Sequence, residues 1–269
     1  MSRPFLTVAR NRVVCVGHDL NGTEESFATR VELDIEGNQR AVRDAIQHAG
    51  DRLGRIVMRY GHDLLGNRIH QHSMEAGARW ILNDATGKPI RTWDSRGHTF
   101  TTTYDALRRP VEQHVRGTFS NADPLEPNSD PRTLDHDLLV DRIEYGEPPL
   151  NATPAQETQA QRLNLRTRIL RHCDCAGIAT NAGLDAGGNP TEAYDFKGNL
   201  LRSTRQLVTD YAAIPDWLLA PGLDAETFEG STRYDALNRP IQTIPPHSSL
   251  TRPGHPSQIN VIQPVFNEA

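Results

Sequence analysis

Four consecutive residues of this sequence, His172 to Cys175, are of types that bind zinc. Imidazole nitrogen, thiolate sulfur and carboxylate oxygen are usual ligands of that ion, and structural sites commonly combine two separated pairs of them. The one further cysteine is Cys15, so the sequence lacks a second pair. Adjacent residues of a strand also point to opposite faces of a sheet, which separates these side chains. We therefore expect no metal site here.

The eleven histidines are a second set of reactive side chains, and His62, His70 and His72 are the closest three. His70 and His72 would share one face of a strand, because side chains alternate. The sequence contains no G-x-S-x-G motif to present a nucleophile. The D-x-D-x-D-G spacing of a calcium loop is also absent. We expect no catalytic, metal-binding or cofactor-binding residue, so the chain is predicted not to be an enzyme.

Aspartate followed three residues later by glycine recurs along most of the chain. Aspartate at the first position of a tight turn accepts backbone hydrogen bonds, and glycine at the fourth position tolerates a positive φ. The copies within Trp80–Gln113 are ten and eleven residues apart, which leaves strands of the usual length between them. The predicted turn residues are Asp34 and Gly37, Asp51 and Gly54, Asp63 and Gly66, Asp84 and Gly87, Asp94 and Gly97, Asp105, Asp174 and Gly177, Asp185 and Gly188, Asp195 and Gly198, and Asp235. These repeats predict a series of antiparallel hairpins.

An aromatic residue directly precedes several of these aspartates: Trp93, Tyr104, Tyr194 and Tyr234. A fixed offset from the turn places the four rings on the same face of a sheet. Cross-strand aromatic pairs contribute about 0.2–1 kcal/mol each, so we expect these rings to be structural. Exposed rings of this kind would also stack on sugars. A carbohydrate-binding or adhesion module is therefore the alternative interpretation.

The pattern as a whole predicts an all-β fold, an antiparallel hairpin meander forming a curved sheet, with one short helix near 154–164. Two repeat blocks, 1–116 and 167–269, flank an interruption at 117–166 that contains loop, strand and helix. The second block has an insertion near 210–230, in which Trp217–Leu219 is predicted to anchor an apolar patch. Thr153 and Gln156 form a capping box with a proline between them, which marks the start of the helix. The helix is mostly polar, so we expect it on the outside of the sheet.

Candidate strands outside the densest repeats are Arg12–Gly17, Phe27–Leu33, Gln39–Ile46 and Leu138–Tyr145. The stretch 40–48 also suits a helix by propensity, but its place between two repeat turns favours a strand. Residues 120–131 are rich in proline, asparagine and aspartate, which is typical of a loop.

Composition excludes several classes of protein. The 269 residues carry a formal net charge of −5 and no polybasic run, so we expect no nucleic-acid partner. No apolar stretch approaches the roughly 20 residues that span a bilayer, so we expect no membrane span. The N-terminus lacks the continuous apolar segment of a Sec signal peptide. Three cysteines do not make a disulfide framework.

Three segments resemble the tyrosine–aspartate (YD) repeat of Rhs proteins. They are 101–110 (TTTYDALRRP), 193–202 (AYDFKGNLLR) and 231–240 (STRYDALNRP). The longer form of the repeat, Tyr194–Arg205 followed by Tyr234–Ile241, is similar to the Rhs region of insecticidal toxin-complex B and C components. The resemblance covers nearly the whole chain.

This resemblance implies a β-ribbon that spirals into a hollow shell around a C-terminal toxin, which the shell keeps unfolded until delivery. The partners it implies are the remainder of the shell, the enclosed toxin and other toxin-complex subunits. It also implies a secreted, extracellular location within a larger toxin. The chain would be a non-catalytic structural segment of the shell.

The sequence departs from a complete family member in two ways. The family's D-P-x-G self-cleavage motif is not matched at Asp123-Pro124 or at Asp130-Pro131, and no toxin-like domain follows Ala269. Phe266 begins what resembles a further turn without a return strand. We therefore expect the chain to be a fragment of a longer protein.

Overall fold

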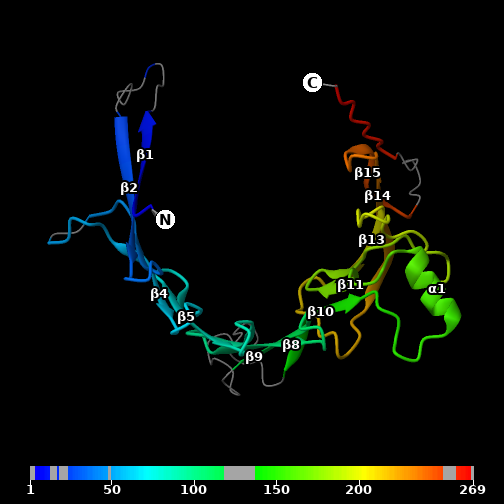
Figure 1. Ribbon diagram of the computed structural model, residues 1–269, viewed down its shortest axis with the longest axis horizontal. Helices are drawn as coiled ribbons and strands as arrows, with labels where there is room; N and C mark the ends of the chain where they lie inside the picture. Colours follow the sequence, from blue (N-terminus) through cyan, green and yellow to red (C-terminus); the bar gives the residue numbers. More distant parts are fainter. Residues whose placement is uncertain are drawn as a thin grey trace. The chain divides into compact units, whose positions relative to one another are not determined.

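The computed structural model describes residues 4–12, 17, 24–47, 50–117, 137–250 and 259–267. These residues form one antiparallel sheet of 15 strands, in which each strand is hydrogen-bonded to the strand before it and the strand after it in sequence. Figure 1 labels most of these strands. The predicted all-β antiparallel meander is confirmed.

The strands are β1 Leu6–Arg12, β2 Glu24–Leu33, β3 Gln39–Arg43, β4 Ile56–His62, β5 Arg68–Ser73, β6 Gly77–Asn83, β7 Pro89–Asp94, β8 His98–Tyr104, β9 Pro110–Gly117, β10 Leu138–Tyr145, β11 Ile169–Asp174, β12 Gly177–Thr180, β13 Arg202–Val208, β14 Leu223–Tyr234 and β15 Pro240–Ser248. Helix α1 spans Pro154–Arg162. The chain divides into two compact units, Met1–Thr101 with Arg116–His136 and Thr102–Val115 with Asp137–Ala269. We call them unit 1 and unit 2. The three predicted sequence blocks, with the insertion near 210–230, remain a prediction.

Unit 1 is a single layer of short strands. Among its described residues Ala41 is the buried hydrophobic side chain, and most strand residues are half-buried or exposed. Cross-strand ion pairs contribute to its cohesion: the Arg43 guanidinium lies 2.5 Å from Glu32 and 2.8 Å from Asp51. Because unit 1 buries so little apolar area, the hydrogen bonds of its local turns must determine much of its fold.

Unit 2 has a second layer of loops and helix over its strands, which gives it two apolar clusters. The first contains Leu139, Cys173, Ile178, Val208 and Trp217. The second joins Ala160 and Leu163 at the end of α1 to Leu165, Ala182 and Ala193. Trp217, in the loop between β13 and β14, is 7% exposed, whereas Leu218 and Leu219 beside it are exposed. Trp217 is therefore the residue that fixes this loop to the sheet.

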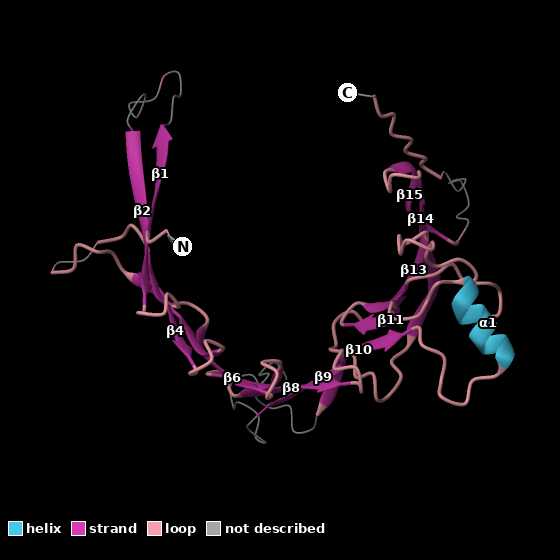
Figure 2. Ribbon diagram, in the orientation of Figure 1, coloured by secondary structure: helices cyan, strands magenta, loops and turns pink. Residues whose placement is uncertain are grey.

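Helix α1 begins as the capping box predicts. Thr153 N donates to Gln156 Oε1 at 2.9 Å, Gln156 N donates to Thr153 Oγ1 at 3.4 Å, and Pro154 is the first helical residue. The helix ends at Arg162, and Asn164 beyond it has a φ of 53°. Most of α1 is exposed, and Ala160 is its buried residue. Figure 2 shows this helix in cyan among the strands and loops of unit 2.

The individual strand predictions had mixed outcomes. The prediction for Leu138–Tyr145 matches β10, and Phe27–Leu33 lies within β2. The predicted strand Gln39–Ile46 was too long, because β3 ends at Arg43. Asp44 there begins a loop: its carboxylate accepts the Ile46 N–H at 3.0 Å. For Arg12–Gly17, β1 ends at Arg12 and residues 13–16, which include Cys15, lie outside the described residues, as does the loop 120–131.

Candidate functional site

The aspartate turns share one hydrogen-bonding arrangement, which the turn at Asp63 illustrates. Gly66 N donates to Asp63 O at 3.1 Å, and Asp63 N donates to Asn67 O at 2.9 Å. Asp63 Oδ1 accepts the N–H groups of Leu65 and Asn67 at 2.9 and 2.8 Å. Asp63 Oδ2 accepts the Asn67 side-chain amide at 3.0 Å. This is a tight turn closed by a one-residue bulge, in which one carboxylate satisfies three donors.

The same backbone bond from the fourth residue to the aspartate carbonyl is present at other predicted turns. It occurs at Asp34, Asp84, Asp94, Asp105, Asp185, Asp195 and Asp235. The aspartate at each also accepts the N–H of the fifth residue. The fourth residue has a positive φ throughout, as Gly37, Gly66, Gly87, Gly97, Gly188 and Gly198, or as Arg108 and Asn238. These side chains are therefore occupied with backbone groups of their own turns.

Two predicted turns are built differently. Asp51 Oδ1 accepts Leu53 N, while its Oδ2 accepts Arg43 Nη1, which also bonds Gly54 O at 2.7 Å. Asp174 lies directly opposite Gly177 in the register of β11 and β12, so this hairpin has a two-residue loop. The φ of Gly177 is 141°.

Donors to the turn aspartates lower their pKa values. For Asp63 the largest cause is the Asn67 side-chain hydrogen bond. Burial alone would raise the pKa of Asp94, but hydrogen bonds from the backbone and ring of His98 outweigh burial and leave the pKa below its ordinary value. The pKa values of Asp34, Asp105, Asp185, Asp195 and Asp235 are lowered as well.

We expect the chain to lose stability in acid because of these shifts. A carboxyl whose pKa is lowered by folding binds fewer protons in the folded chain than in the unfolded chain. Protonation therefore stabilises the unfolded state relative to the folded state as pH falls. The contribution is complete above the ordinary value of 3.8 and is lost as pH falls through the lowered folded values. Urea midpoints at pH 6 and pH 3 measure this, with Asp63→Asn giving a shallower decline. Equal midpoints at both pH values would contradict it.

Turns on the same edge of the sheet contact one another. In unit 1 a Cβ added at Gly66 would lie 3.5 Å from Asn38 Oδ1, and one added at Gly87 would lie 3.1 Å from Asn67 Oδ1. In unit 2, Asn199 Nδ2 donates to Asn238 Oδ1 at 3.0 Å, which joins the Asp195 and Asp235 turns. The fifth residue of one turn thus lies against the fourth residue of the next turn on that edge.

The rings that precede the aspartates are placed in different surroundings. Trp93 is opposite Trp80 in the register of β6 and β7, and Tyr234 is opposite Pro240. The Arg108 guanidinium lies 5.2 Å from the Tyr104 ring centre. Tyr194 donates its hydroxyl to Ile169 O at 2.7 Å, with the Arg168 guanidinium 5.5 Å from its ring. The ring and hydroxyl of Tyr194 are therefore engaged within the protein.

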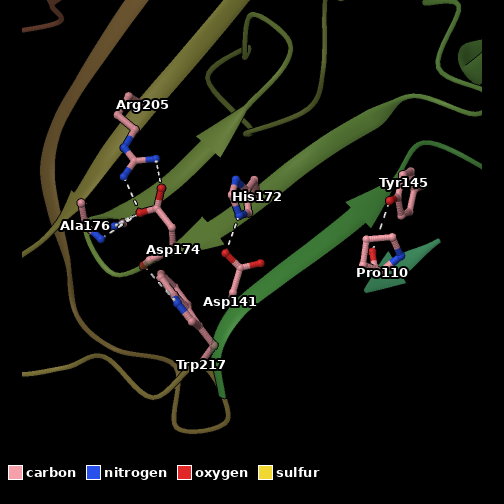
Figure 3. A network of polar contacts seen from close by, with 9 residues as sticks. Pro110, Asp141, Tyr145, His172, Asp174, Ala176, Arg205 and Trp217 are labelled. Atoms are coloured by element: carbon pink, nitrogen blue, oxygen red, sulfur yellow. Dashed lines mark hydrogen bonds and ion pairs between the residues drawn. The ribbon is translucent and has the colours of Figure 1, made fainter. Parts of the chain in front are cut away.

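Two residues of the run from His172 to Cys175, namely His172 and Asp174, lie in the polar network of Figure 3. His172 Nε2 is 2.7 Å from Asp141 Oδ2, and Arg205 binds both carboxylate oxygens of Asp174 at 2.8 and 2.5 Å. Trp217 Nε1 donates to Asp174 O at 3.2 Å. Cys173 is buried in the first apolar cluster, which also contains Trp217 of this network. The described residues contain no group of three or more potential ligands that would hold a metal ion.

Both thiols in this run have pKa values raised above the ordinary value. Burial raises the pKa of Cys173, and burial together with the charge of Asp174 raises the pKa of Cys175. The thiolate is the reactive form, and a raised pKa reduces its population at neutral pH. The hydrogen bonds from Arg205 and Trp217 position the Asp174 hairpin.

The histidines of unit 1 occupy separate surroundings. His70 is opposite Gly61 and its ring is 5.5 Å from that of Trp80, while His72 is opposite Arg59. His70 and His72 therefore have different cross-strand neighbours on β4.

One partly buried ion-pair network was not predicted from the sequence. Arg109 binds Asp105 through Nε at 2.7 Å and Glu147 through both terminal nitrogens, at 2.7 and 3.0 Å. Its guanidinium lies 3.9 Å from the Tyr145 ring centre. The Arg109 hydrogen bond lowers the pKa of Glu147, which also accepts Thr167 N at 2.7 Å. The basic fifth residue of the Asp105 turn was the available signal, whereas Glu147 is too distant in sequence to be paired with it.

Replacing Thr167 by glycine is expected to stabilise the chain by about 1 kcal/mol, because a β-branched residue with positive φ is strained. Thr167 has a φ of 66° and an exposed side chain. The substitution keeps the backbone N–H that Glu147 binds. Urea denaturation measures the change, and Thr99→Gly within β8 is the control, for which a loss is expected. A loss of stability in Thr167→Gly would contradict the strain.

The antiparallel β-ribbon of this chain is similar in fold to solved structures of toxin complexes. The chain is similar to a crystal structure of TcdB2-TccC3, with a TM-score of 0.57, 19% identity, and coverage of 93% of this chain and 12% of that chain. It is also similar to the Tc holotoxin pore of Photorhabdus luminescens that carries a TccC3 mutation, with a TM-score of 0.59, 17% identity and coverage of 97% and 12%. A crystal structure of TcdB2-TccC3-TEV is similar with a TM-score of 0.57 and 17% identity, covering 96% of this chain and 12% of that chain.

These comparisons confirm, at the level of the fold, the resemblance to the Rhs region of toxin-complex proteins. The chain spans about 12% of the length of the solved chains that it matches. No protein-family model and no curated protein sequence matches it. Within the described residues, no helix is long and apolar enough to cross a membrane.

Proposed function

We propose that this chain is a segment of the wall of an Rhs-type β-shell that encloses a toxin. The segment itself would have no catalytic role. The observation that supports this most is the continuous meander, whose likeness to toxin-complex structures extends over at least 93% of the chain. The wall of a shell needs a sheet that extends continuously. The described strands form such a sheet, because they follow one another without a crossover.

The chemistry of the side chains supports a structural role. The turn aspartates hold backbone groups, Asp174 is held by Arg205, and Asp141 is paired with His172. The partners in this proposal are the remainder of the same shell, the enclosed toxin and other toxin-complex subunits. The larger toxin would act outside the cell that makes it.

The size and shape of the native product test this proposal. An antibody raised against the chain would identify the product in its source, for sizing by light scattering and imaging by negative-stain electron microscopy. We expect a protein several times larger than 30.0 kDa that forms hollow particles. A native product of 30.0 kDa that stays monomeric would overturn the proposal, because one such chain cannot close a shell.

A glycan array separates the shell from the adhesion alternative. We expect the chain to bind no glycan, because Tyr194 is held by Ile169 and Arg168 within unit 2. Specific glycan binding that is lost in Tyr104→Ala or Tyr234→Ala would instead favour a surface-binding module.

A further inference from the structure

A cavity of about 330 Å³ lies on one face of the sheet in unit 2. Its floor is a row of side chains that are paired across four strands: Glu144 is opposite Arg171, which is opposite Thr180, which is opposite Thr204. Ile178 and Gln206 form the adjacent row. The cavity thus lies across β10, β11, β12 and β13.

The wall of the cavity comes from the Asp185 turn. Leu184 and Pro190 form an isolated β-bridge at the base of this turn, and both line the cavity together with Gly188. Leu170 at the start of β11 lines it as well. A repeat turn that elsewhere connects two strands therefore covers part of the sheet here.

The polar groups of the cavity differ in how firmly they are held. Thr204 Oγ1 donates to Ala182 O at 2.9 Å, and Gln206 Nε2 donates to Asp224 O at 2.7 Å, so both are engaged. Arg171 Nη1 and Glu144 Oε2 are 3.9 Å apart, and these side chains are 42% and 45% exposed. A pair this loose and solvated contributes little, so either group can take another partner. The cavity therefore combines four apolar side chains, Leu170, Ile178, Leu184 and Pro190, with one exchangeable acceptor and one exchangeable donor.

We propose that this cavity binds one large apolar side chain of an extended polypeptide. Glu144 accepts an N–H group of the bound backbone and Arg171 donates to a C=O group, which matches the alternation of donors and acceptors along an extended chain. The volume is at the small end for ligand sites, so it holds a side chain with its adjoining backbone. A folded partner would need an interface of roughly 1,000 Å² or more, which a cavity of this size does not provide.

This inference rests on the proposed function, because an unfolded toxin enclosed by the shell is the polypeptide that such a cavity would meet. One cavity gives a weak contact, since ordering an unfolded segment costs entropy. Weak contacts of this kind hold a chain unfolded without trapping it.

Binding of a permanently unfolded protein to the full 269-residue chain tests the site. The probe is fluorescein-labelled, reduced and carboxymethylated α-lactalbumin, followed by fluorescence anisotropy. Thr180→Trp fills the cavity from a half-buried strand position, and Thr92→Trp makes the same change at a half-buried position of β7 in unit 1. We expect Thr92→Trp to bind like the unsubstituted chain and Thr180→Trp to bind about tenfold more weakly.

Leu184→Ser serves as a second variant, because it removes part of the apolar wall from outside the named strands, and it too is expected to weaken binding. Circular dichroism confirms that each variant is folded. Unaltered binding in both cavity variants would overturn the site. Equally strong binding of native, folded α-lactalbumin would overturn the extended ligand. Absence of binding by the unsubstituted chain would overturn the inference and leave the shell to be judged by particle size and shape.

Discussion

Replacing Trp217 by alanine is expected to destabilise the chain by about 3–5 kcal/mol, the usual cost of removing a buried tryptophan. The side chain is 7% exposed and packs with Leu139, Cys173 and Ile178 from three strands. It also donates Nε1–H to Asp174 O, and its backbone N–H donates to Leu139 O at 2.9 Å. The substitution leaves a cavity in the first apolar cluster and removes one hydrogen bond to the Asp174 carbonyl.

Urea denaturation followed by circular dichroism measures this loss. Trp80→Ala is the matched control, because Trp80 lies on a strand with 45% of its surface exposed. We expect Trp217→Ala to lower the midpoint much more than Trp80→Ala does. Equal effects would show that the loop containing Trp217 adds no core to unit 2.

Replacing Gly177 by alanine is expected to cost about 3 kcal/mol or more, from a strained backbone together with a steric clash. The φ of Gly177 is 141°, and a Cβ built there would lie 2.1 Å from Gln206 O. That oxygen belongs to the backbone of β13, so a side-chain rotation cannot relieve the contact. We expect the β11–β12 hairpin to separate from β13 or to change its register.

Gly188→Ala is the control for this substitution. Gly188 also has a positive φ, of 78°, but a Cβ there would meet nothing within 4 Å. Only the backbone strain then remains, which costs roughly 1–2 kcal/mol. The difference between the two midpoints isolates the clash with Gln206, and equal losses would contradict it.

The parts of the fold that follow from short-range contacts were predictable from the sequence. An aspartate accepts N–H groups two and four residues ahead, as Asp63 does from Leu65 and Asn67, so the sequence contains both partners side by side. The capping box of Thr153 and Gln156 is equally local. Repetition then extends one local rule along the chain, which is why the meander could be predicted.

The parts that depend on distant partners were not predictable in this way. Leu139 accepts from Trp217, and Arg109 binds Glu147 38 residues away. No periodicity links such pairs. The cavity also depends on residues that are distant in sequence, because it forms where the Asp185 turn covers strands that precede and follow it. The early end of β3 arises from Asp44, whose turn has no glycine at the fourth position to mark it.

The contact between turns on one edge has a consequence for how such proteins change in length. Asp63, Asp84 and Asp105 begin turns 21 residues apart, and each spacing contains two strands and the turn on the opposite edge. Deletion of residues 63–83 would lead β4 directly into the Asp84 turn and β7, with all later strands keeping their direction. Loss of one strand would reverse every strand after it and move its turns to the other edge. Insertions and deletions in evolution are therefore expected to occur in whole hairpins, so that the ribbon lengthens without redesign of its turns.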